Sequence, residues 1–228
     1  MRRRTRRLLD LALGGGGLVA TAPIWIGVAA AIWLEDRGPV VFRQQRVGVG
    51  GKPFTILKFR TMFRDADRAG AHFTADRDPR ITRVGGLLRA TKLDELPQLL
   101  NVIRGEMGLV GPRPESLAYF ERYDEASREL ASVLPGITDP SSIAFRWEGR
   151  LLDEVADPDR FYWEVMVPAK VRTSLAYAHR ATLRSDLGVL AKTLLAVLDR
   201  SPPPSPEEMR ARYAPDAPPE AATLRSNR

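Results

Sequence analysis

The chain has 228 residues, of which 44% are hydrophobic and 28% are charged, with no cysteine and two histidines. This composition predicts one folded domain with a sizeable core. It excludes a disulfide-rich protein, a thiolate zinc site and a chain that is disordered throughout. The formal net charge is +7, but five arginines among the first seven residues supply most of it, so we expect no nucleic-acid partner.

The first predicted element is an uncharged stretch at residues 11–34. A helix of this length would be about 36 Å long, which is enough to cross the core of a bilayer. A cleaved signal peptide fits poorly, because the stretch is long and contains Pro23, Trp25 and Trp33. We therefore expect residues 1–36 to anchor the protein in a membrane.

The charged residues on either side of this stretch indicate whether it crosses the membrane or returns to the same face. Arginines precede it, and Arg37, Arg43 and Arg46 follow it, so both ends favour the cytoplasmic side. Pro23 lies in the middle of the stretch and has no backbone N–H to donate. These features predict a kinked, re-entrant helix that enters and leaves by the same face, with a single crossing as the alternative.

Two runs of β-type residues, 40–47 and 53–62, surround a glycine cluster and predict an antiparallel hairpin. The cluster lacks the glycine spacing of a nucleotide-binding loop, so we interpret it as a turn. Lys58 and Arg60 have the same parity in the second run and are expected to project from one face. That face is either part of a basic site or simply solvated.

The segment at residues 91–115 is the most informative. Its apolar spacing predicts a helix that begins at Pro97 and ends at Gly105. Asp94 and Glu95 then lie at or just before the helix N-terminus, where free N–H groups and the helix dipole favour phosphate. Two acids beside an anion site suit phosphoryl transfer, with one carboxylate as nucleophile and the other as ligand of a divalent cation. A pair that merely caps the helix is the alternative.

Two arginines flank this segment. A short helix predicted over residues 83–89 places Arg89 near its end. Arg113 lies between Pro112 and Pro114, which restrict the backbone and thereby fix a guanidinium for bidentate contact with phosphate or a base edge. An ordinary loop arginine is the other interpretation.

The remaining sequence completes the predicted organisation. An apolar helical stretch at residues 187–198 is too short to span a membrane, so it either packs on the core or lies in the membrane interface. Residues 37–200 form a cytoplasmic domain, and residues 201–228, with seven prolines, form a disordered tail. The predicted fold class is α+β, mainly helical with a small antiparallel hairpin.

Five stretches together resemble one family, the monotopic phosphoglycosyl transferases. These are bacterial sugar transferases that load the first sugar phosphate onto a polyprenol phosphate. The stretches are RRLLDLAL, GPVVFRQQRVGVGGKPFTILKFRTM, RITRVGGLLR, LDELPQLLNVIRGEMGLVGPRP and PGITDPSSIAFRWE. Two positions depart from the family pattern, Ala22-Pro23 in place of Ser-Pro and Gly108 in place of a small polar residue. Thr21 can supply the missing hydroxyl by bonding back to the helix.

The resemblance implies a two-step phosphoryl transfer. Asp94 would attack the sugar-linked phosphate of a UDP-sugar and expel UMP. A polyprenol phosphate such as undecaprenyl phosphate would then take the phosphosugar from the aspartate, which initiates glycan or exopolysaccharide assembly. By the same likeness Glu95 would bind Mg²⁺.

The resemblance also assigns binding residues and a location. Arg113 would contact the nucleotide and Arg89 the lipid phosphate, and the remaining matches to basic or motif positions are Lys58, Arg60, Pro112 and Pro114. The implied protein is monotopic, with a re-entrant helix and interfacial amphipathic helices in the lipid bilayer. Its catalytic domain would lie on the cytoplasmic face of the bacterial inner membrane.

Two other classes of function are compatible with the residues alone. A non-catalytic membrane scaffold of a glycan assembly complex would tolerate substitution of Asp94. A membrane-anchored DNA-binding protein would bind DNA in a salt-dependent way, but no predicted helix is dense in arginine and asparagine. The residues leave the sugar, the glycan pathway and the oligomeric state open.

Overall fold

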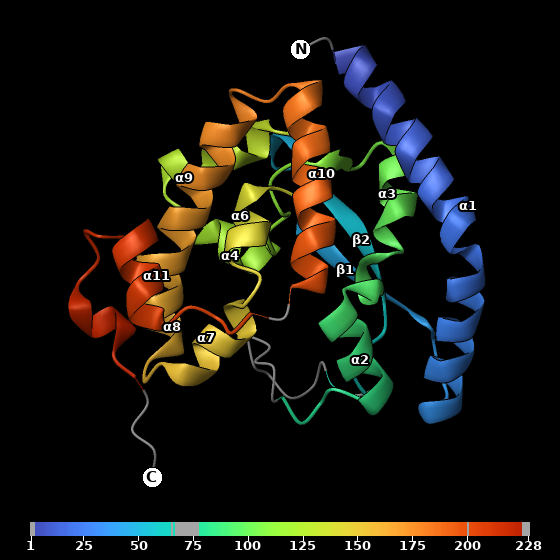
Figure 1. The fold of residues 1–228 in the computed structure, drawn as a ribbon, viewed down its shortest axis with the longest axis horizontal. Coiled ribbons are helices and arrows are strands. Elements are labelled where there is room, and N and C mark those ends of the chain that lie inside the picture. The colour runs from blue at the N-terminus through green and yellow to red at the C-terminus, as the bar shows by residue number, and fades with distance from the viewer. Residues whose placement is uncertain (1–2, 65, 67–77, 200, 225–228) are drawn as a thin grey trace.

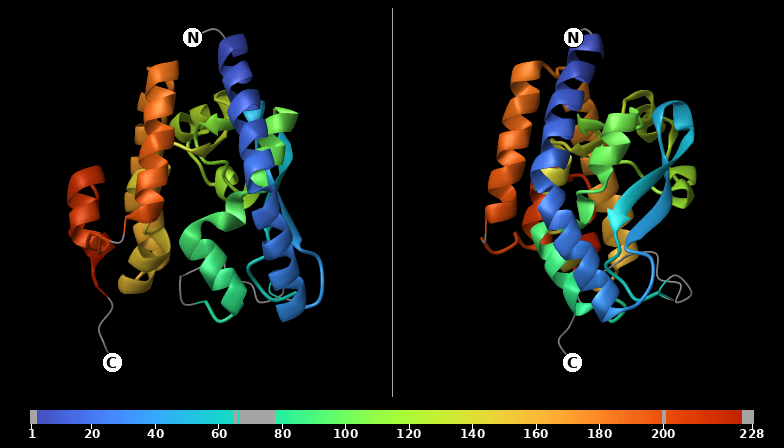
Figure 2. Two further views of the ribbon diagram at one scale, coloured as in Figure 1. Left: turned by 45° about the vertical axis from the view of Figure 1, so that its right-hand side comes forward. Right: turned by 90° about the vertical axis from the view of Figure 1, so that its right-hand side faces the viewer.

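The computed structural model covers residues 3–64, 66, 78–199 and 201–224. Within these residues the protein is mainly helical (Figure 1), and it has two small two-stranded sheets. The longest element, helix α1 (Arg3–Glu35), lies along one side of the molecule (Figures 1 and 2). Within the described residues it is the one helix long and apolar enough to cross a membrane, and its re-entry stays a prediction.

Helix α1 continues through Pro23. The Thr21 hydroxyl donates to the backbone carbonyl of Gly17 (2.7 Å), and the indole N–H of Trp25 donates to the Thr21 hydroxyl (3.2 Å). The back-bonding threonine expected beside Ala22-Pro23 is therefore present. Such bonds often accompany a bend, and Figure 1 shows the axis of α1 changing direction about midway along its length.

The predicted hairpin is confirmed. Strands β1 (Val41–Val47) and β2 (Pro53–Phe59) pair in antiparallel register, and the glycine cluster between them forms a tight turn in which Gly50 has a φ of 70°. Strand β2 ends three residues earlier than predicted. The chain beyond Phe59 pairs instead with the start of the next helix, where the Thr82 N–H donates to the Thr61 carbonyl (3.0 Å).

The two helices predicted around the acidic pair are also present. Helix α2 spans Arg83–Thr91, a 3₁₀ turn covers Leu93–Glu95, and helix α3 spans Gln98–Arg104. Gly105 ends α3 in the left-handed conformation, with a φ of 84°, which is the role that the sequence predicts for it.

A second sheet was not predicted. Strands β3 (Gly108–Val110) and β4 (Gly136–Thr138) pair in parallel. Strands of three residues that contain glycine give almost no alternating signal in a sequence. A Cβ atom added to Gly136 would lie 2.1 Å from the Gly111 nitrogen, so the two backbones approach more closely than a side chain would allow.

The C-terminal part of the chain is helical and has a core of its own. Leu151, Phe161, Val165 and Met166 are fully buried in this core, which we call the C-terminal core. The helical elements from residue 117 onward include α4 (Leu117–Glu121), α5 (Glu125–Arg128), α6 (Pro140–Ala144), α7 (Glu148–Glu154), α8 (Pro158–Phe161), a π-helical turn (Tyr162–Met166), α9 (Val167–Ala178), α10 (Leu183–Leu198) and α11 (Pro206–Tyr213).

Two smaller apolar clusters hold α1 against the domain. Near the middle of α1, Gly14 and Gly17 face Val102 and Leu99 of α3. Near its C-terminal end, buried side chains of α1 join Phe59 of β2 and others in a separate cluster, whose buried members are Val28, Ile32, Phe59 and Leu88. Helix α1 therefore contacts the same domain over most of its length.

The prediction of a disordered tail was wrong for the residues described there. Helix α11 begins with a capping box formed by Ser205 and Glu208, and Pro206 occupies its first turn, where proline is well tolerated. Met209 is buried in the C-terminal core. The prolines that indicated disorder therefore start a helix and shape the segment around it.

Helix α10 packs on the core along one side, as one of the two predicted alternatives has it, and its place in a membrane interface stays a prediction. It is longer than predicted, and Val189 on one side is buried in the core around α3. On another side, Leu194 and Leu198 leave 69% and 76% of their surface exposed. Helices α1 and α10 begin next to each other, where Arg6 Nε lies 3.2 Å from Asp186 Oδ2.

Candidate active site

The acidic pair lies in the tight connection between α2 and α3. Lys92 ends α2 in the left-handed conformation, with a φ of 58°, and the chain then turns so that Asp94 points inward. Asp94 is buried, with 7% of its surface exposed. Its Oδ1 has no hydrogen-bond partner among the described residues. Burial raises the pKa of Asp94, the neighbouring Glu95 raises it further, and the charge of Lys58 acts against both.

Glu95, the next residue, is in the opposite situation. Its carboxylate accepts a bidentate pair of bonds from Arg113, with Nη2 at 2.7 Å and Nη1 at 3.2 Å, and a further bond from Lys58 Nζ at 3.3 Å. Burial alone would raise the pKa of Glu95, but the charges of Arg113 and Lys58 outweigh it and hold that pKa well below its ordinary value. Two neighbouring acids therefore have pKa values displaced in opposite directions, which commonly separates their chemical roles.

Four of the predicted site residues are thus brought together: Asp94, Glu95, Lys58 and Arg113. Lys58 arrives from β2, and burial lowers its pKa despite the opposing charge of Glu95. Pro112 and Pro114 are both buried on either side of the exposed Arg113. The Pro112 carbonyl accepts the Gly136 N–H (2.9 Å), so β4 helps to hold the loop that carries Arg113.

The two other predicted residues lie elsewhere. Arg60 donates to the backbone carbonyl of Asp36, and its Nη2 lies 3.5 Å from the Asp36 carboxylate, at the end of α1. Arg89 lies half-buried in the last turn of α2. The pKa of Asp78 is lowered mainly by hydrogen bonds from Arg80, and the charge of Arg89 adds to this effect. Within the described residues neither Arg60 nor Arg89 forms a hydrogen bond or an ion pair with Asp94 or Glu95. Their predicted contacts with substrate stay predictions.

Sequence reasoning missed a third cation beside Lys58 and Arg113. Arg46 of β1 is fixed by Gln44, whose Oε1 accepts bonds from Arg46 Nε (3.1 Å) and Nη2 (2.7 Å). Burial lowers the pKa of Arg46, and the nearby charge of Arg113 lowers it further. The hairpin register could have revealed it, because Gln44, Arg46 and Lys58 all fall on one face of the ribbon.

Further polar groups line this region. Glu115 Oε2 accepts bonds from the hydroxyls of Tyr123 (3.1 Å) and Tyr162 (3.3 Å), and Lys170 Nζ bonds Glu148 (2.7 Å). The carboxylate of Glu95, and to a smaller extent that of Glu148, raises the pKa of Arg113. The three cations therefore face carboxylates that balance them, in a field suited to a phosphate ligand.

Asn101 and Gln98 of α3 were also missed. Asn101 is fully buried, and its side chain accepts the Leu57 N–H (3.0 Å) and donates to the Thr55 carbonyl (2.7 Å), which ties α3 to β2. Gln98 is buried as well, and its Nε2 has no hydrogen-bond partner among the described residues. A buried amide in an otherwise apolar helical stripe is the sequence signal that could have identified both residues.

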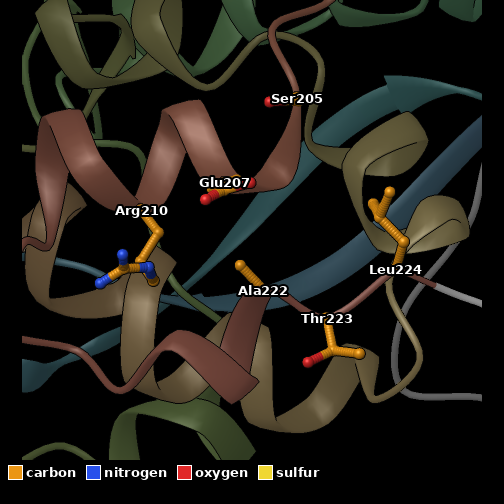
Figure 3. Close-up of a pocket in the computed structure, with 6 residues that line it drawn as sticks. All are labelled: Ser205, Glu207, Arg210, Ala222, Thr223 and Leu224. Atoms are coloured by element: carbon orange, nitrogen blue, oxygen red, sulfur yellow. The ribbon is translucent and has the colours of Figure 1, made fainter.

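Figure 3 shows a separate pocket of about 260 Å³ in the C-terminal segment. It is lined by side chains of α11 and of the chain after it, including Arg210 and Thr223, and contains none of the predicted site residues. The polar groups that could bind a charged ligand beside Asp94 are therefore distinct from this pocket.

Comparison with known proteins agrees with this geometry. The family model described as bacterial sugar transferase matches residues 1–200. A UDP-glucose:undecaprenyl-phosphate glucose-1-phosphate transferase of Caulobacter vibrioides is 46% identical over 136 residues, which are 58% of this chain and 51% of that protein.

Two further relatives match most of the chain. A UDP-N-acetylgalactosamine-undecaprenyl-phosphate N-acetylgalactosaminephosphotransferase of Aeromonas hydrophila is 34% identical over 85% of this chain and 43% of its own length. The exopolysaccharide production protein ExoY of Sinorhizobium fredii is 32% identical over 85% of each chain. The chain thus spans about half of the Caulobacter and Aeromonas relatives and most of the Sinorhizobium one. Together with the family match, these similarities show that the chain belongs to the bacterial sugar transferase family.

Proposed function

We propose that the protein transfers a sugar 1-phosphate from a UDP-sugar to a polyprenol phosphate, with release of UMP, through a covalent intermediate on Asp94. The observation that carries this proposal is a buried carboxylate oxygen of Asp94 that has no hydrogen-bond partner in the described part of the chain, beside a Glu95 that two cations already neutralise. The names of the Caulobacter and Aeromonas relatives support the two substrate classes. The name of the Sinorhizobium relative supports a role in exopolysaccharide production.

The first step follows from the free oxygen of Asp94. That oxygen attacks the sugar-linked phosphorus of the UDP-sugar and forms a phosphorus–oxygen bond, while the bond from the same phosphorus to UMP breaks. Lys58, Arg46 and Arg113 lie where they can balance the charge of the two phosphates. UMP leaves with the bonding electrons, so no proton transfer is needed.

The second step reverses the roles. A phosphate oxygen of the polyprenol phosphate attacks the phosphorus held on Asp94, and the aspartate leaves as a free carboxylate. The products are a polyprenol diphosphate sugar and the original enzyme. Because the sugar phosphate is stored on the protein between the steps, the water-soluble donor and the lipid acceptor need not be bound together.

The residues present fit a Mg²⁺ ion in one respect and depart from the prediction in another. Mg²⁺ is commonly held by one or two carboxylates together with substrate phosphates and water. The Asp94 carboxylate forms no hydrogen bond or ion pair among the described residues, so its second oxygen remains for an ion while Oδ1 attacks, whereas Glu95 is occupied by Lys58 and Arg113. We therefore propose Asp94 rather than Glu95 as the protein ligand. When bound, the ion would neutralise phosphate oxygens. No group of three or more candidate ligand side chains occurs among the described residues.

We also propose a monotopic location on the cytoplasmic face of the inner membrane. Arg7 near the start of α1 bonds carbonyls of α3, and Ile32 near its end packs with Phe59 of the same domain. A helix that crossed the bilayer would separate its two ends by the thickness of the membrane, so contact of both ends with one domain supports the re-entrant arrangement. The exposed leucines of α10 support an interfacial position for that helix.

The test is UMP release by the detergent-purified full chain. The assay supplies a panel of UDP-sugars with Mg²⁺, with and without undecaprenyl phosphate, to wild type, Asp94→Asn and the exposed control Asp216→Asn. We expect one donor to give UMP, and without acceptor we expect no more than one UMP per enzyme together with a matching mass increase of the intact protein. Asp94→Asn should abolish both signals, and Asp216→Asn should retain them.

Other results have defined meanings. UMP release that persists in Asp94→Asn would overturn Asp94 as the nucleophile. UMP release that needs both substrates at once, without any mass increase, would overturn the covalent intermediate. No UMP from any donor, together with normal glycan synthesis in cells that carry Asp94→Asn, would favour the non-catalytic scaffold.

A further inference from the structure

The first turns of α1 bind the domain through side chains. Arg6 donates to the Val110 carbonyl, Arg7 donates to the carbonyls of Val102 and Ile103, and Asp10 Oδ1 accepts the Leu109 N–H at 3.0 Å. Asp10 is only 3% exposed. From the sequence these arginines were counted as charges that orient the membrane helix. In the structure Arg6 and Arg7 are occupied by backbone acceptors of the domain.

Asp10 and Arg6 act on strand β3. Among the described residues this strand has a single neighbour, β4, so its other edge presents backbone groups that no described strand satisfies. Asp10 takes the Leu109 N–H at that edge, and Arg6 takes the Val110 carbonyl. Two side chains of α1 therefore bind backbone groups of β3 that a third strand could otherwise bind.

The position of β3 is important because this strand leads directly to Arg113. The chain runs from Val110 through Gly111 and Pro112 directly to Arg113, the bidentate partner of Glu95. The backbone of this connection is closely confined. A Cβ on Gly111 would lie 2.4 Å from the Leu134 carbonyl oxygen, and the Pro112 carbonyl accepts the Gly136 N–H. A displacement of β3 is therefore passed to Arg113.

Arg7 acts on the other half of the site. The last carbonyls of a helix lack the usual partner one turn further along. At the C-terminal end of α3, Arg7 binds the carbonyl of Ile103 and that of Val102, which also accepts the Gly105 N–H (3.0 Å). The N-terminal end of α3 adjoins Asp94 and Glu95. The same turns of α1 thus contact the helix that follows the acidic pair and the strand that leads to Arg113.

We infer that Arg6, Arg7 and Asp10 are positioning residues, which set the placement of Arg113 relative to Asp94 and Glu95 by fixing β3 and α3 to one helix. The inference rests on the proposed function for its catalytic consequence. Its structural part, the fixing of β3 by Asp10, is measurable without any turnover.

The catalytic test compares charge-matched variants of the full chain. Arg6→Gln and Arg4→Gln remove the same charge from the same turns of α1, but Arg4 is exposed and forms no hydrogen bond or ion pair within the described residues. We expect kcat for UMP release to fall at least tenfold in Arg6→Gln and to change less than twofold in Arg4→Gln. Equal effects of the two would mean that the charges act on the membrane and would overturn the inference.

Asp10 provides a second, independent pair of variants. Asp10→Asn keeps an oxygen that can accept the Leu109 N–H, whereas Asp10→Ala removes it. We expect a tenfold or larger loss of kcat in Asp10→Ala and at least partial rescue in Asp10→Asn. In an Arg113→Ala background the further loss from Asp10→Ala should be less than twofold, because the group that it positions is already absent. A full additional loss would point to general destabilisation instead.

Hydrogen–deuterium exchange separates this inference from the proposed function. We expect faster exchange of peptides covering residues 108–114 in Asp10→Ala, and also in Arg6→Gln, with wild-type rates in Arg4→Gln and Asp10→Asn. If wild type releases no UMP but exchange follows this pattern, the proposed function fails while the fixing of β3 stands. Unchanged exchange in Arg6→Gln, with equal activity of Arg6→Gln and Arg4→Gln, would contradict the inference even if Asp10→Ala does not fold.

Discussion

The region around α3 and the C-terminal core are built in different ways. The C-terminal core buries large apolar side chains such as Phe161 and Met166. Around α3, buried polar side chains reach across to the backbone of other elements, as Asn101 does to β2 and Asp10 to β3. Apolar burial is roughly proportional to area and is not directional, whereas a hydrogen bond fixes particular atoms. We conclude that the C-terminal core mainly supplies stability and the α3 region mainly supplies geometry.

The largest effect is expected at Asp94, where activity and stability should move in opposite directions. Asp94→Asn should lower kcat at least ~1,000-fold, because the nucleophile is lost. It should also raise the midpoint of thermal unfolding at neutral pH. The folded protein raises the pKa of Asp94, so its ionised form destabilises the fold, and the neutral amide removes that penalty.

The sign of this stability change can be checked with pH. The contribution of a group with a raised pKa is fully favourable below its ordinary value of 3.8 and is lost as pH rises through the folded pKa. The difference in unfolding midpoint between Asp94→Asn and wild type should therefore shrink towards acid pH. A variant that is less stable than wild type at neutral pH would show that the Asp94 carboxylate is stabilised, contrary to its burial.

The next prediction concerns the C-terminal core alone. Leu151→Ala should lower the free energy of unfolding by about 2–5 kcal/mol through loss of buried apolar contact and the cavity that remains. Because the C-terminal core acts on stability, kcat per folded molecule should stay within about twofold of wild type. Denaturant unfolding and active-site titration by the UMP burst measure the two quantities. A large loss of kcat in the folded fraction would contradict the division between the regions.

In the α3 region, Asn101→Ala should lower kcat as well as the free energy of unfolding, whereas Leu151→Ala should lower only the latter. The Asn101 substitution leaves the Leu57 N–H and the Thr55 carbonyl without their side-chain partner, for which we expect a loss of about 1–3 kcal/mol in unfolding free energy. Since Asn101 ties α3 to the strand that carries Lys58, kcat should also fall, by about tenfold. The same unfolding and burst measurements apply, and the ratio of the two effects, compared with Leu151→Ala, sharpens the comparison.

The smallest predicted effect is a shift in pH dependence. The positive charge of Lys58 opposes the rise in the pKa of Asp94. In Lys58→Gln that pKa should rise further, so activity should be lost at a higher pH as the medium is acidified and Asp94 becomes protonated. The pH profile of kcat/KM for UMP release measures the shift. An acid limb that moves to lower pH would show that another group controls it.

Local patterns were sufficient for a large part of the fold and the site. The hairpin, α2 and α3 follow from periodicity and from proline and glycine positions, whereas site roles for Lys58 and Arg113 were implied by the family resemblance. The features that were missed depend on contacts between distant positions. Asp10 and Leu109 are 99 residues apart in the chain, and nothing near either residue predicts that they meet. The β3–β4 pair was missed because strands of three residues that contain glycine give almost no alternating signal.

The sequence was misleading where one residue type has two uses. Proline-rich composition indicated a disordered tail, yet Pro206 starts α11. Likewise, the charge of the basic residues in the first turns of α1 indicates only an orientation in the membrane, although Arg6 and Arg7 also present directed donors that reach backbone carbonyls. Composition counts such residues but does not locate their partners.

The packing of α11 affects where this protein can be shortened. The family match ends at residue 200, which invites an expression clone that stops there. Such a clone would remove Met209 from the C-terminal core, the Thr223 carbonyl that accepts the Ala156 N–H (2.9 Å), and the Tyr213 carbonyl that accepts a bond from Arg172 (2.6 Å). For protein production and crystallisation, the folded unit extends to at least residue 224.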